Sequence, residues 1–175
     1  GDGWPDVLAT ESRPMVLYVN PRTENRRWDR HEVIPGIISE STVLHDMNGD
    51  GRPEVVYALA QGTVAYAAPD PSNATAPWTV HHISDPLGRR SVVHGLGAGD
   101  VNGDGRPDVL IRDGWFEQPA EVTADGTWTY HEFPFATAGH IEGSGGAKMS
   151  VVDLNGDGLN DVVASLNAHG WGMAW

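Results

Sequence analysis

Six residues in the pattern Asp-x-Asn-Gly-Asp-Gly occur three times in this 175-residue chain. Each copy is followed by an acidic residue and then by a run rich in Val, Ile or Leu. Three complete copies and one N-terminal half copy span residues 46–54, 100–108, 153–161 and 1–6. The complete copies begin 54 and 53 residues apart. Sequence repeats of roughly this length, with several short strands per unit, are typical of propeller blades, so the spacing favours a repeating β architecture.

The residue types in the motif predict calcium loops. Ca²⁺ binds six to eight oxygen atoms at about 2.3 to 2.6 Å, and the side chains at motif positions 1, 3, 5 and 9 all carry oxygen. The backbone carbonyl at position 7 adds another oxygen, and glycine at position 6 allows the positive φ of a tight loop. The predicted ligands are Asp46, Asn48, Asp50, Arg52 and Glu54; Asp100, Asn102, Asp104, Arg106 and Asp108; Asp153, Asn155, Asp157, Leu159 and Asp161; and Asp2, Trp4 and Asp6 in the half copy. We therefore expect three to four structural Ca²⁺ ions.

The motif has two other interpretations. An EF-hand loop shares the first six positions but needs a bidentate Glu at position 12 and flanking helices. Position 12 is Tyr57, Ile111 or Ala164 here, so the sequence excludes an EF-hand. The second interpretation is a metal-free turn, because Asp, Asn and Gly favour turns without an ion. The acidic residue kept at position 9 in every copy favours calcium over this alternative.

A second landmark repeats in phase with the loops. Trp28, Trp78 and Trp128 lie 50 residues apart, and a histidine follows each of them by three positions. We expect these tryptophans, and the histidines His31, His81 and His131, to pack between repeats. In the first unit we predict strands over 7–10, 15–19, 28–34 and 41–45, and no segment has a sustained helical period. The predicted class is all-β, with four-stranded antiparallel blades around a central axis.

These motifs make the chain resemble the FG-GAP/VCBS repeat family of calcium-binding β-propellers, which includes blades like those of integrin α-subunits. The resemblance extends over residues 1–175. It implies a propeller that usually has seven blades, with one ion in each calcium loop. The chain holds about three and a half blades, and known propellers close with about four to eight. We therefore expect the remaining blades to come from the same parent chain or from other copies of this one.

Composition limits the partners and the compartment. The net charge of −13 argues against a nucleic-acid partner, and 11 of the 24 acidic residues belong to the loops. No apolar run approaches the ~18 residues of a membrane span. Calcium sites of this kind fill most easily outside the cytosol, so we expect an extracellular or periplasmic protein. The chain has no initiator Met and begins inside a motif, so we expect it to be a piece of a longer one.

The loop-bearing edge of each blade predicts where a ligand would lie. If each loop joins the inner strand to the second strand, the opposite face collects residues before the inner strands and after the second strands. The polar and aromatic residues expected there are Arg89, Arg90, His94, Arg112, Trp115, His140, Lys148, His169 and Trp171. Loops that converge near a propeller axis commonly bind ligands. The plain alternative is that these histidines are solvated loop residues, because they share no fixed spacing.

Three functions fit the sequence. The first is a non-catalytic, calcium-stabilised module that binds carbohydrate or protein, since Trp and Arg suit sugar stacking and hydrogen bonding. The second is a carbohydrate-active lyase or dehydratase, in which His94, His140 and His169 hold a Lewis-acid metal; no nucleophile motif or carboxylate pair outside the calcium loops supports it. The third is a self-assembling fragment in which several copies complete one ring, because closure removes exposed sheet edges.

Overall fold

A computed structural model describes the chain except for residues 1, 12, 89–93, 123–125, 136–145 and 167–171. Its described residues form four small antiparallel sheets and one 3₁₀ turn, η1 (Ala60–Gly62). The first sheet contains β1 (Val7–Thr10), β2 (Met15–Val19) and β3 (Asp29–Ile34), and the second contains β4 (Val43–His45), β5 (Glu54–Ala58), β6 (Val64–Ala68) and β7 (Thr79–His82). The third sheet contains β8 (Gly97–Gly99), β9 (Asp108–Ile111), β10 (Gly114–Glu117) and β11 (Thr129–Glu132). The fourth sheet contains β12 (Met149–Val152), β13 (Asp161–Ser165) and β14 (Met173–Ala174). The predicted all-β class is therefore correct.

Each sheet is a simple meander in which strands pair with their neighbours in the chain. The motif loops join β4 to β5, β8 to β9 and β12 to β13, as predicted. The prediction of four strands in every unit holds for the second and third sheets, whereas three strands are described in the first and fourth. Two strand limits were also wrong by one or two residues: β3 begins at Asp29 and β4 at Val43.

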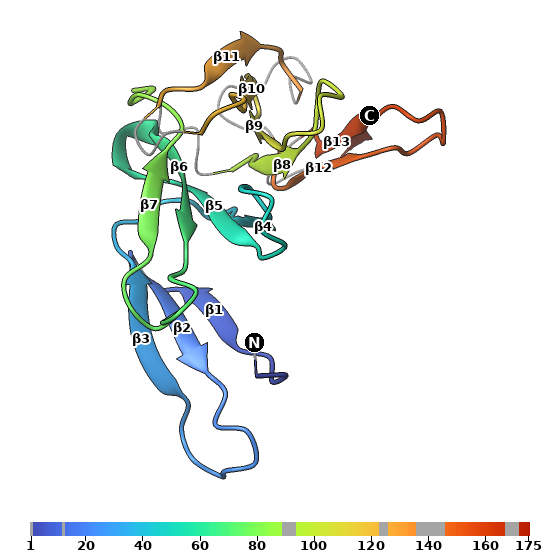
Figure 1. Ribbon diagram of the computed structural model, residues 1–175. Helices are drawn as coiled ribbons and strands as arrows, with labels where there is room; N and C mark the ends of the chain where they lie inside the picture. Colours follow the sequence, from blue (N-terminus) through green and yellow to red (C-terminus); the bar gives the residue numbers. More distant parts are fainter. Residues whose placement is uncertain (1, 12, 89–93, 123–125, 136–145, 167–171) are drawn as a thin grey trace.

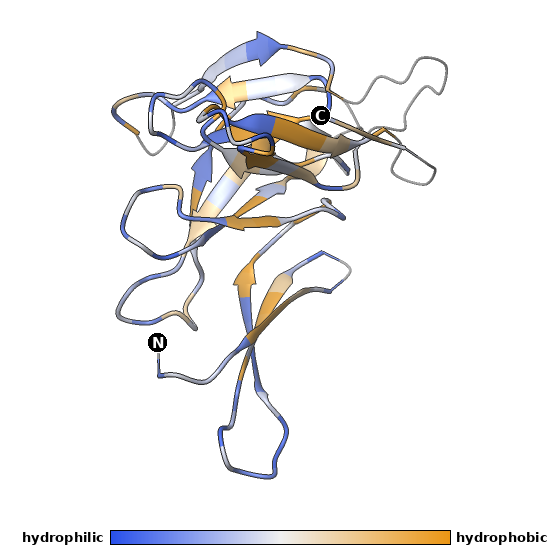
Figure 2. Ribbon diagram, turned by 90° about the vertical axis from the view of Figure 1, so that its right-hand side faces the viewer, coloured by the Kyte–Doolittle hydropathy of each residue, from blue (hydrophilic) through white to orange (hydrophobic). Residues whose placement is uncertain are grey.

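The core lies between the sheets, because the middle strands bury both of their faces. All five residues of β5 are buried. Val55 and Tyr57 pack against the first sheet, whereas Val56 and Ala58 pack against the third. Successive side chains of a strand point to opposite faces, and a β-branched, apolar strand suits burial on both. In Figure 2 the hydrophobic residues are concentrated on strands, and most of the connecting loops are hydrophilic.

The first strands of the second, third and fourth sheets come together. β8 contacts both β4 and β12, and the Leu96 carbonyl accepts a 3.0 Å hydrogen bond from the Met149 N–H. A Cβ at Gly97 would lie 2.9 Å from the Cβ of Met149. Glycine thus permits an approach that no other residue would allow. Figure 1 shows the four sheets following one another without closing into a ring within the described residues.

The repeated tryptophans join neighbouring sheets, as expected. The backbone N–H of Trp78 donates to the Val33 carbonyl at 2.8 Å, and the backbone N–H of Trp128 donates to the Ile83 carbonyl at 2.9 Å. Val33 lies one residue before the end of β3, and Ile83 directly follows β7; these are the outermost strands of the preceding sheets. Trp128 is 3% exposed, whereas Trp28, in the first sheet, is 37% exposed. Trp78 and Trp128 therefore each connect their own sheet to the preceding one through a backbone hydrogen bond.

Two of the repeated histidines pack against aromatic rings. The rings of His81 and Tyr66 are stacked, with centroids 4.7 Å apart. The rings of His131 and Trp115 are stacked at 4.2 Å, and Nε2 of His131 lies 2.7 Å from a carboxylate oxygen of Glu117. Both contacts join paired strands of one sheet, so these histidines pack within their own repeat and not between repeats as predicted.

Candidate calcium loops and the opposite face

The first carboxylate of each motif organises the loop around itself. In loop 46–54, Asp46 accepts hydrogen bonds from the N–H groups of Gly49, Asp50 and Gly51 at 2.8, 3.1 and 2.8 Å. The equivalent contacts in loops 100–108 and 153–161 measure between 2.7 and 3.2 Å. Gly49 and Gly51 have φ of 76° and 82°, a region that favours glycine. These bonds, with that from Gly51 the largest effect, lower the pKa of Asp46.

The next two side chains repeat the arrangement along the loop. Asn48 accepts the N–H of Asp50 at 2.9 Å, and Asp50 accepts the N–H of Arg52 at 2.8 Å. Both contacts recur in the other complete loops at 2.8 to 3.0 Å. In the half copy, Asp2 accepts the N–H of Trp4 at 3.0 Å. The three complete motifs thus share one conformation, built from contacts within nine residues.

The acid at position 9 is buried in loops 46–54 and 100–108, whereas Asp161 of loop 153–161 is half-buried. Glu54 and Asp108 are 1% and 0% exposed. Glu54 accepts the N–H of Met47 at 2.8 Å, and Asp108 accepts that of Val101 at 2.9 Å. Burial raises the pKa of both acids, because the charged form loses its water. Asp161 makes the same contact with Leu154 at 3.0 Å.

The donor set fits Ca²⁺ chemically. Each complete loop offers carboxylate, amide and carbonyl oxygens without nitrogen or sulfur ligands, as a hard cation prefers. An ionised carboxylate has about four acceptor positions, so a backbone N–H does not use up its capacity. Among the described side chains, no three His, Cys, Asp or Glu groups converge on one metal position. Calcium binding would therefore require side chains of the loop to rotate toward the ion, and the free acceptor positions of the carboxylates allow this while their backbone N–H contacts remain.

In two of the sheets, a residue directly after a strand also donates a hydrogen bond to the acid at position 9, and the sequence did not predict this contact. The N–H of Gln118, directly after β10, donates to Asp108 at 3.0 Å. The N–H of Asn20, directly after β2, donates to Asp6 at 2.9 Å. The equivalent residue after β6 is Pro69, which has no N–H to donate. The hairpins between these positions differ in length, so no fixed spacing from the motif marks them.

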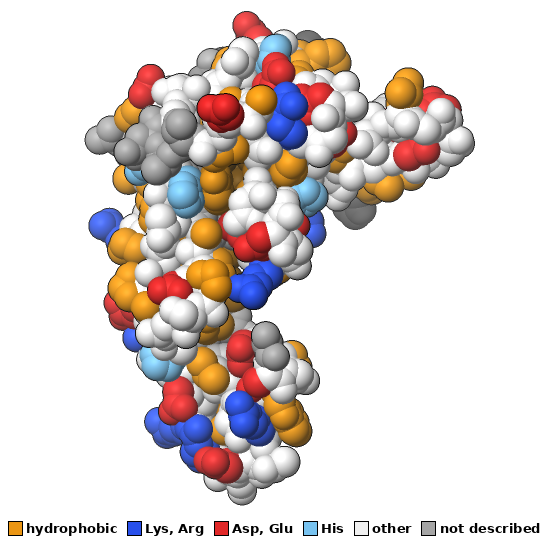
Figure 3. Space-filling view, viewed as in Figure 1, with side chains coloured by type: hydrophobic (Ala, Val, Ile, Leu, Met, Phe, Trp, Pro, Cys, Tyr) orange, Lys and Arg blue, Asp and Glu red, His pale blue; other side chains and the backbone are white. Residues whose placement is uncertain are grey.

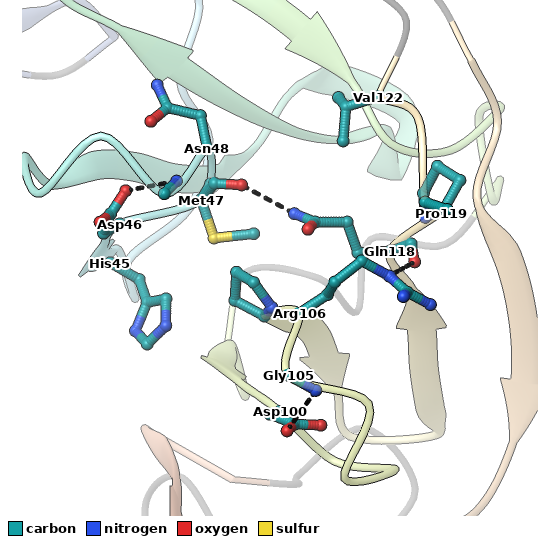
Figure 4. A pocket seen from close by; sticks show the side chains of 13 residues that line it. His45, Asp46, Met47, Asn48, Asp100, Gly105, Arg106, Gln118, Pro119 and Val122 are labelled. Atoms are coloured by element: carbon teal, nitrogen blue, oxygen red, sulfur yellow. Dashed lines mark hydrogen bonds between the residues drawn. The ribbon is translucent and has the colours of Figure 1, made fainter.

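A cleft of about 780 Å³ opens between loops 46–54 and 100–108, on the loop side of the second and third sheets. Figure 4 shows Asp46, Asn48, Asp100 and Arg106 around it. The Arg106 side chain donates from Nε to the Gln118 carbonyl at 3.0 Å and pairs with Asp104. The sequence predicted a ligand site on the opposite face and did not predict this cleft.

The opposite face gathers some of the predicted ligand residues. Lys148 pairs with Leu96 in a parallel bridge, and it lies just before β12 as His94 lies before β8. Nε2 of His94 lies 3.6 Å from a carboxylate oxygen of Glu40, and Ser41 donates to the Ala147 carbonyl. The starts of three inner strands therefore meet on this face.

The other predicted residues of this face divide into two groups. Arg112 follows β9, as expected, and its Nε pairs with Asp113 at 3.2 Å. Trp115 was placed wrongly, because it belongs to β10 and its ring packs against the core between the third and fourth sheets. The residues outside the described part of the chain are Arg89, Arg90, His140, His169 and Trp171.

Opposite charges are interspersed on the first sheet. Arg26 pairs with Glu24 at 2.6 Å and with Asp29 at 2.8 Å, and Arg30 pairs with Glu11 at 2.8 Å and with Glu32 at 3.0 Å. Blue and red side chains accordingly lie side by side in this region in Figure 3. Acidic and basic side chains therefore offset one another in these pairs.

Comparison with known families agrees with the repeats. A model described as FG-GAP-like repeat matches the chain twice, over residues 1–57 and 46–111. Loop 46–54 lies in both matches. The search found no significant match among curated proteins or solved structures. No described helix is long and apolar enough to cross a membrane.

Proposed function

The chain belongs to the FG-GAP-like repeat family, and from that premise we propose that it is a calcium-stabilised β-propeller module that binds a carbohydrate or protein partner. The observation that carries the proposal is the buried acid at position 9 of loops 46–54 and 100–108. A buried carboxylate is costly unless a positive charge compensates it. A Ca²⁺ ion held by the same loop supplies that charge.

The ions have a structural role in this proposal. Each complete loop supplies five predicted oxygen ligands, which leaves little open coordination for a substrate. The ion would fix the connection between the first and second strands of a sheet, and hence the docking of neighbouring sheets. FG-GAP repeats are typically extracellular, and calcium is most available there, so we place the module outside the cytosol.

The incomplete ring and the ligand face belong to the same proposal. The close approach of β4, β8 and β12 supports an axis lined by the first strand of each blade. The remaining blades of a ring of about seven would come in cis or from other copies of the chain. His94 and Lys148 lie at the starts of these strands, so we propose the face opposite the loops for the partner.

Thermal unfolding with and without calcium tests the structural role. With a dissociation constant of about 10⁻⁴ M, as in extracellular calcium modules, 10 mM Ca²⁺ stabilises each occupied loop by about 2.7 kcal/mol. For a chain of this size, that corresponds to roughly 5 to 10 °C in Tm per loop. KCl at matched ionic strength controls for charge screening. A melting temperature that EDTA and calcium leave unchanged would refute the proposal.

A further inference from the structure

One buried side chain connects the second and third sheets next to their calcium loops. Nε2 of Gln118 donates to the Met47 carbonyl at 2.8 Å, across the base of the cleft in Figure 4. Gln118 and Met47 are 5% and 1% exposed. Breaking this contact would leave buried polar groups without their partner, which is unfavourable. Burial therefore raises the free-energy cost of breaking the hydrogen bond between Gln118 and Met47.

Both ends of the bridge are tied to a position-9 acid. The Gln118 N–H donates to Asp108 at 3.0 Å, and the Met47 N–H donates to Glu54 at 2.8 Å. Three hydrogen bonds therefore run from the acid of loop 100–108, through Gln118 and Met47, to the acid of loop 46–54. Every residue in this relay is buried.

We propose that Gln118 is a positioning residue that couples the two loops, so that calcium in one raises the affinity of the other. The inference rests on the proposed function, because it concerns how the calcium loops communicate. An ion that fixes Asp108 also fixes the backbone of Gln118, and the Gln118 amide then holds loop 46–54 at Met47. The second ion finds a loop that is already ordered and loses less conformational entropy on binding. By linkage, the effect is equal in the reverse direction.

Among the described residues, this relay is found only between loops 46–54 and 100–108. Asn20 occupies the equivalent place in the first sheet, but its side chain donates to the Pro5 carbonyl, within the half copy of the motif in the same sheet, at 2.9 Å. The corresponding Pro69 offers no N–H. Loop 153–161 contacts its neighbour through Asn160, whose Nδ2 donates to the Asp100 carbonyl at 2.8 Å, but this contact is exposed. Because water competes for exposed hydrogen bonds, we expect weaker coupling there.

A double-mutant cycle with CaCl₂ as the probe tests the coupling. Two-dimensional ¹⁵N NMR follows each loop separately through the N–H groups of Gly51 and Gly105, which contact the first carboxylate of their loops. Asp104→Ala removes a ligand from loop 100–108. We expect it to weaken calcium binding in loop 46–54 by about fivefold or more, the lower end of typical coupling. In the Gln118→Met background the same change should alter that affinity less than twofold.

Two further variants keep the test decisive. Gln118→Asn retains an amide but is one methylene too short to reach the Met47 carbonyl, and it should lose coupling as Gln118→Met does. Asn20→Ala removes the equivalent side chain in the first sheet, where no such bridge exists, and should leave coupling intact.

The outcomes separate this inference from the function on which it rests. Binding in both loops with no effect of Asp104→Ala on loop 46–54, or coupling that persists in both Gln118 variants, overturns the relay and leaves calcium stabilisation standing. The absence of any calcium-dependent shift at Gly51 and Gly105 overturns both.

Discussion

Replacing the repeated tryptophans one at a time should produce a graded loss of stability that follows burial. Trp128 is 3% exposed and lies 6.4 Å from Tyr66, ring centre to ring centre, in the core between the second and third sheets. An aromatic side chain buries about 200 Å², and about 25 cal/mol per Å² gives about 5 kcal/mol. That area overstates the gain relative to a compact unfolded chain. We therefore expect Trp128→Ala to cost about 4 kcal/mol, in the usual range for such truncations.

The same substitution at Trp28 is the matched control. Trp28 is 37% exposed, so water can fill the space that alanine leaves and no buried cavity forms. We expect Trp28→Ala to cost about 2.5 kcal/mol by the same area relation and the same reduction for a compact unfolded chain. Trp78 is half-buried and its Nε1 donates to the Ala74 carbonyl at 2.8 Å, so it should fall between them.

Urea unfolding followed by circular dichroism measures all three variants, at saturating calcium to hold ion binding constant. The expected gap of about 1.5 kcal/mol between Trp128→Ala and Trp28→Ala corresponds to roughly 3 to 6 °C in Tm. Equal losses at the two positions, within about 0.5 kcal/mol, would refute the reasoning that the repeated tryptophan stabilises more where a preceding sheet buries it.

Three further predictions concern single contacts. Gly97→Ala should cost about 2 kcal/mol or more in urea unfolding, because the new Cβ would lie 2.9 Å from the Cβ of Met149 and force two strands apart; a loss below about 0.5 kcal/mol would contradict that close approach. Tyr57→Phe should be neutral or stabilising by about 1 kcal/mol, since the buried Tyr57 hydroxyl has no hydrogen-bond partner among the described residues; a clear destabilisation in the same assay would show that the hydroxyl is paired. Asp153→Ala removes the acceptor of three backbone N–H groups and should lower the calcium stoichiometry by one ion in isothermal titration calorimetry, whereas unchanged stoichiometry would exclude loop 153–161 as a site.

The spacing of the motif predicted the order of elements because the loop is a local structure. Asp46 makes all three of its backbone contacts within five residues, and the strand that follows begins at the acid of position 9. Contacts of this range depend on residue type and chain geometry alone. The repeat therefore predicted the class, the meander and the place of each loop between two strands.

Residues in turns and at strand ends were predicted less well. Trp115 was expected after β9, but the turn between β9 and β10 is so short that this residue already lies in β10. Its ring stacks on His131 and joins the packing between sheets. A change of one or two residues in a turn moves a side chain between loop and strand, and no pattern in the sequence fixes that length.

The sequence by itself determined the conformation of the motif loops, since each is built from neighbours along the chain. Only the tertiary structure decided which tryptophan is buried, where the cleft opens, and that Gln118 reaches Met47 across 71 residues of sequence. Such contacts exist only once two sheets have docked, because the position of one sheet sets which groups of the other come within hydrogen-bond distance. The motif thus specifies each loop separately, and the docking of the sheets specifies how the loops are connected.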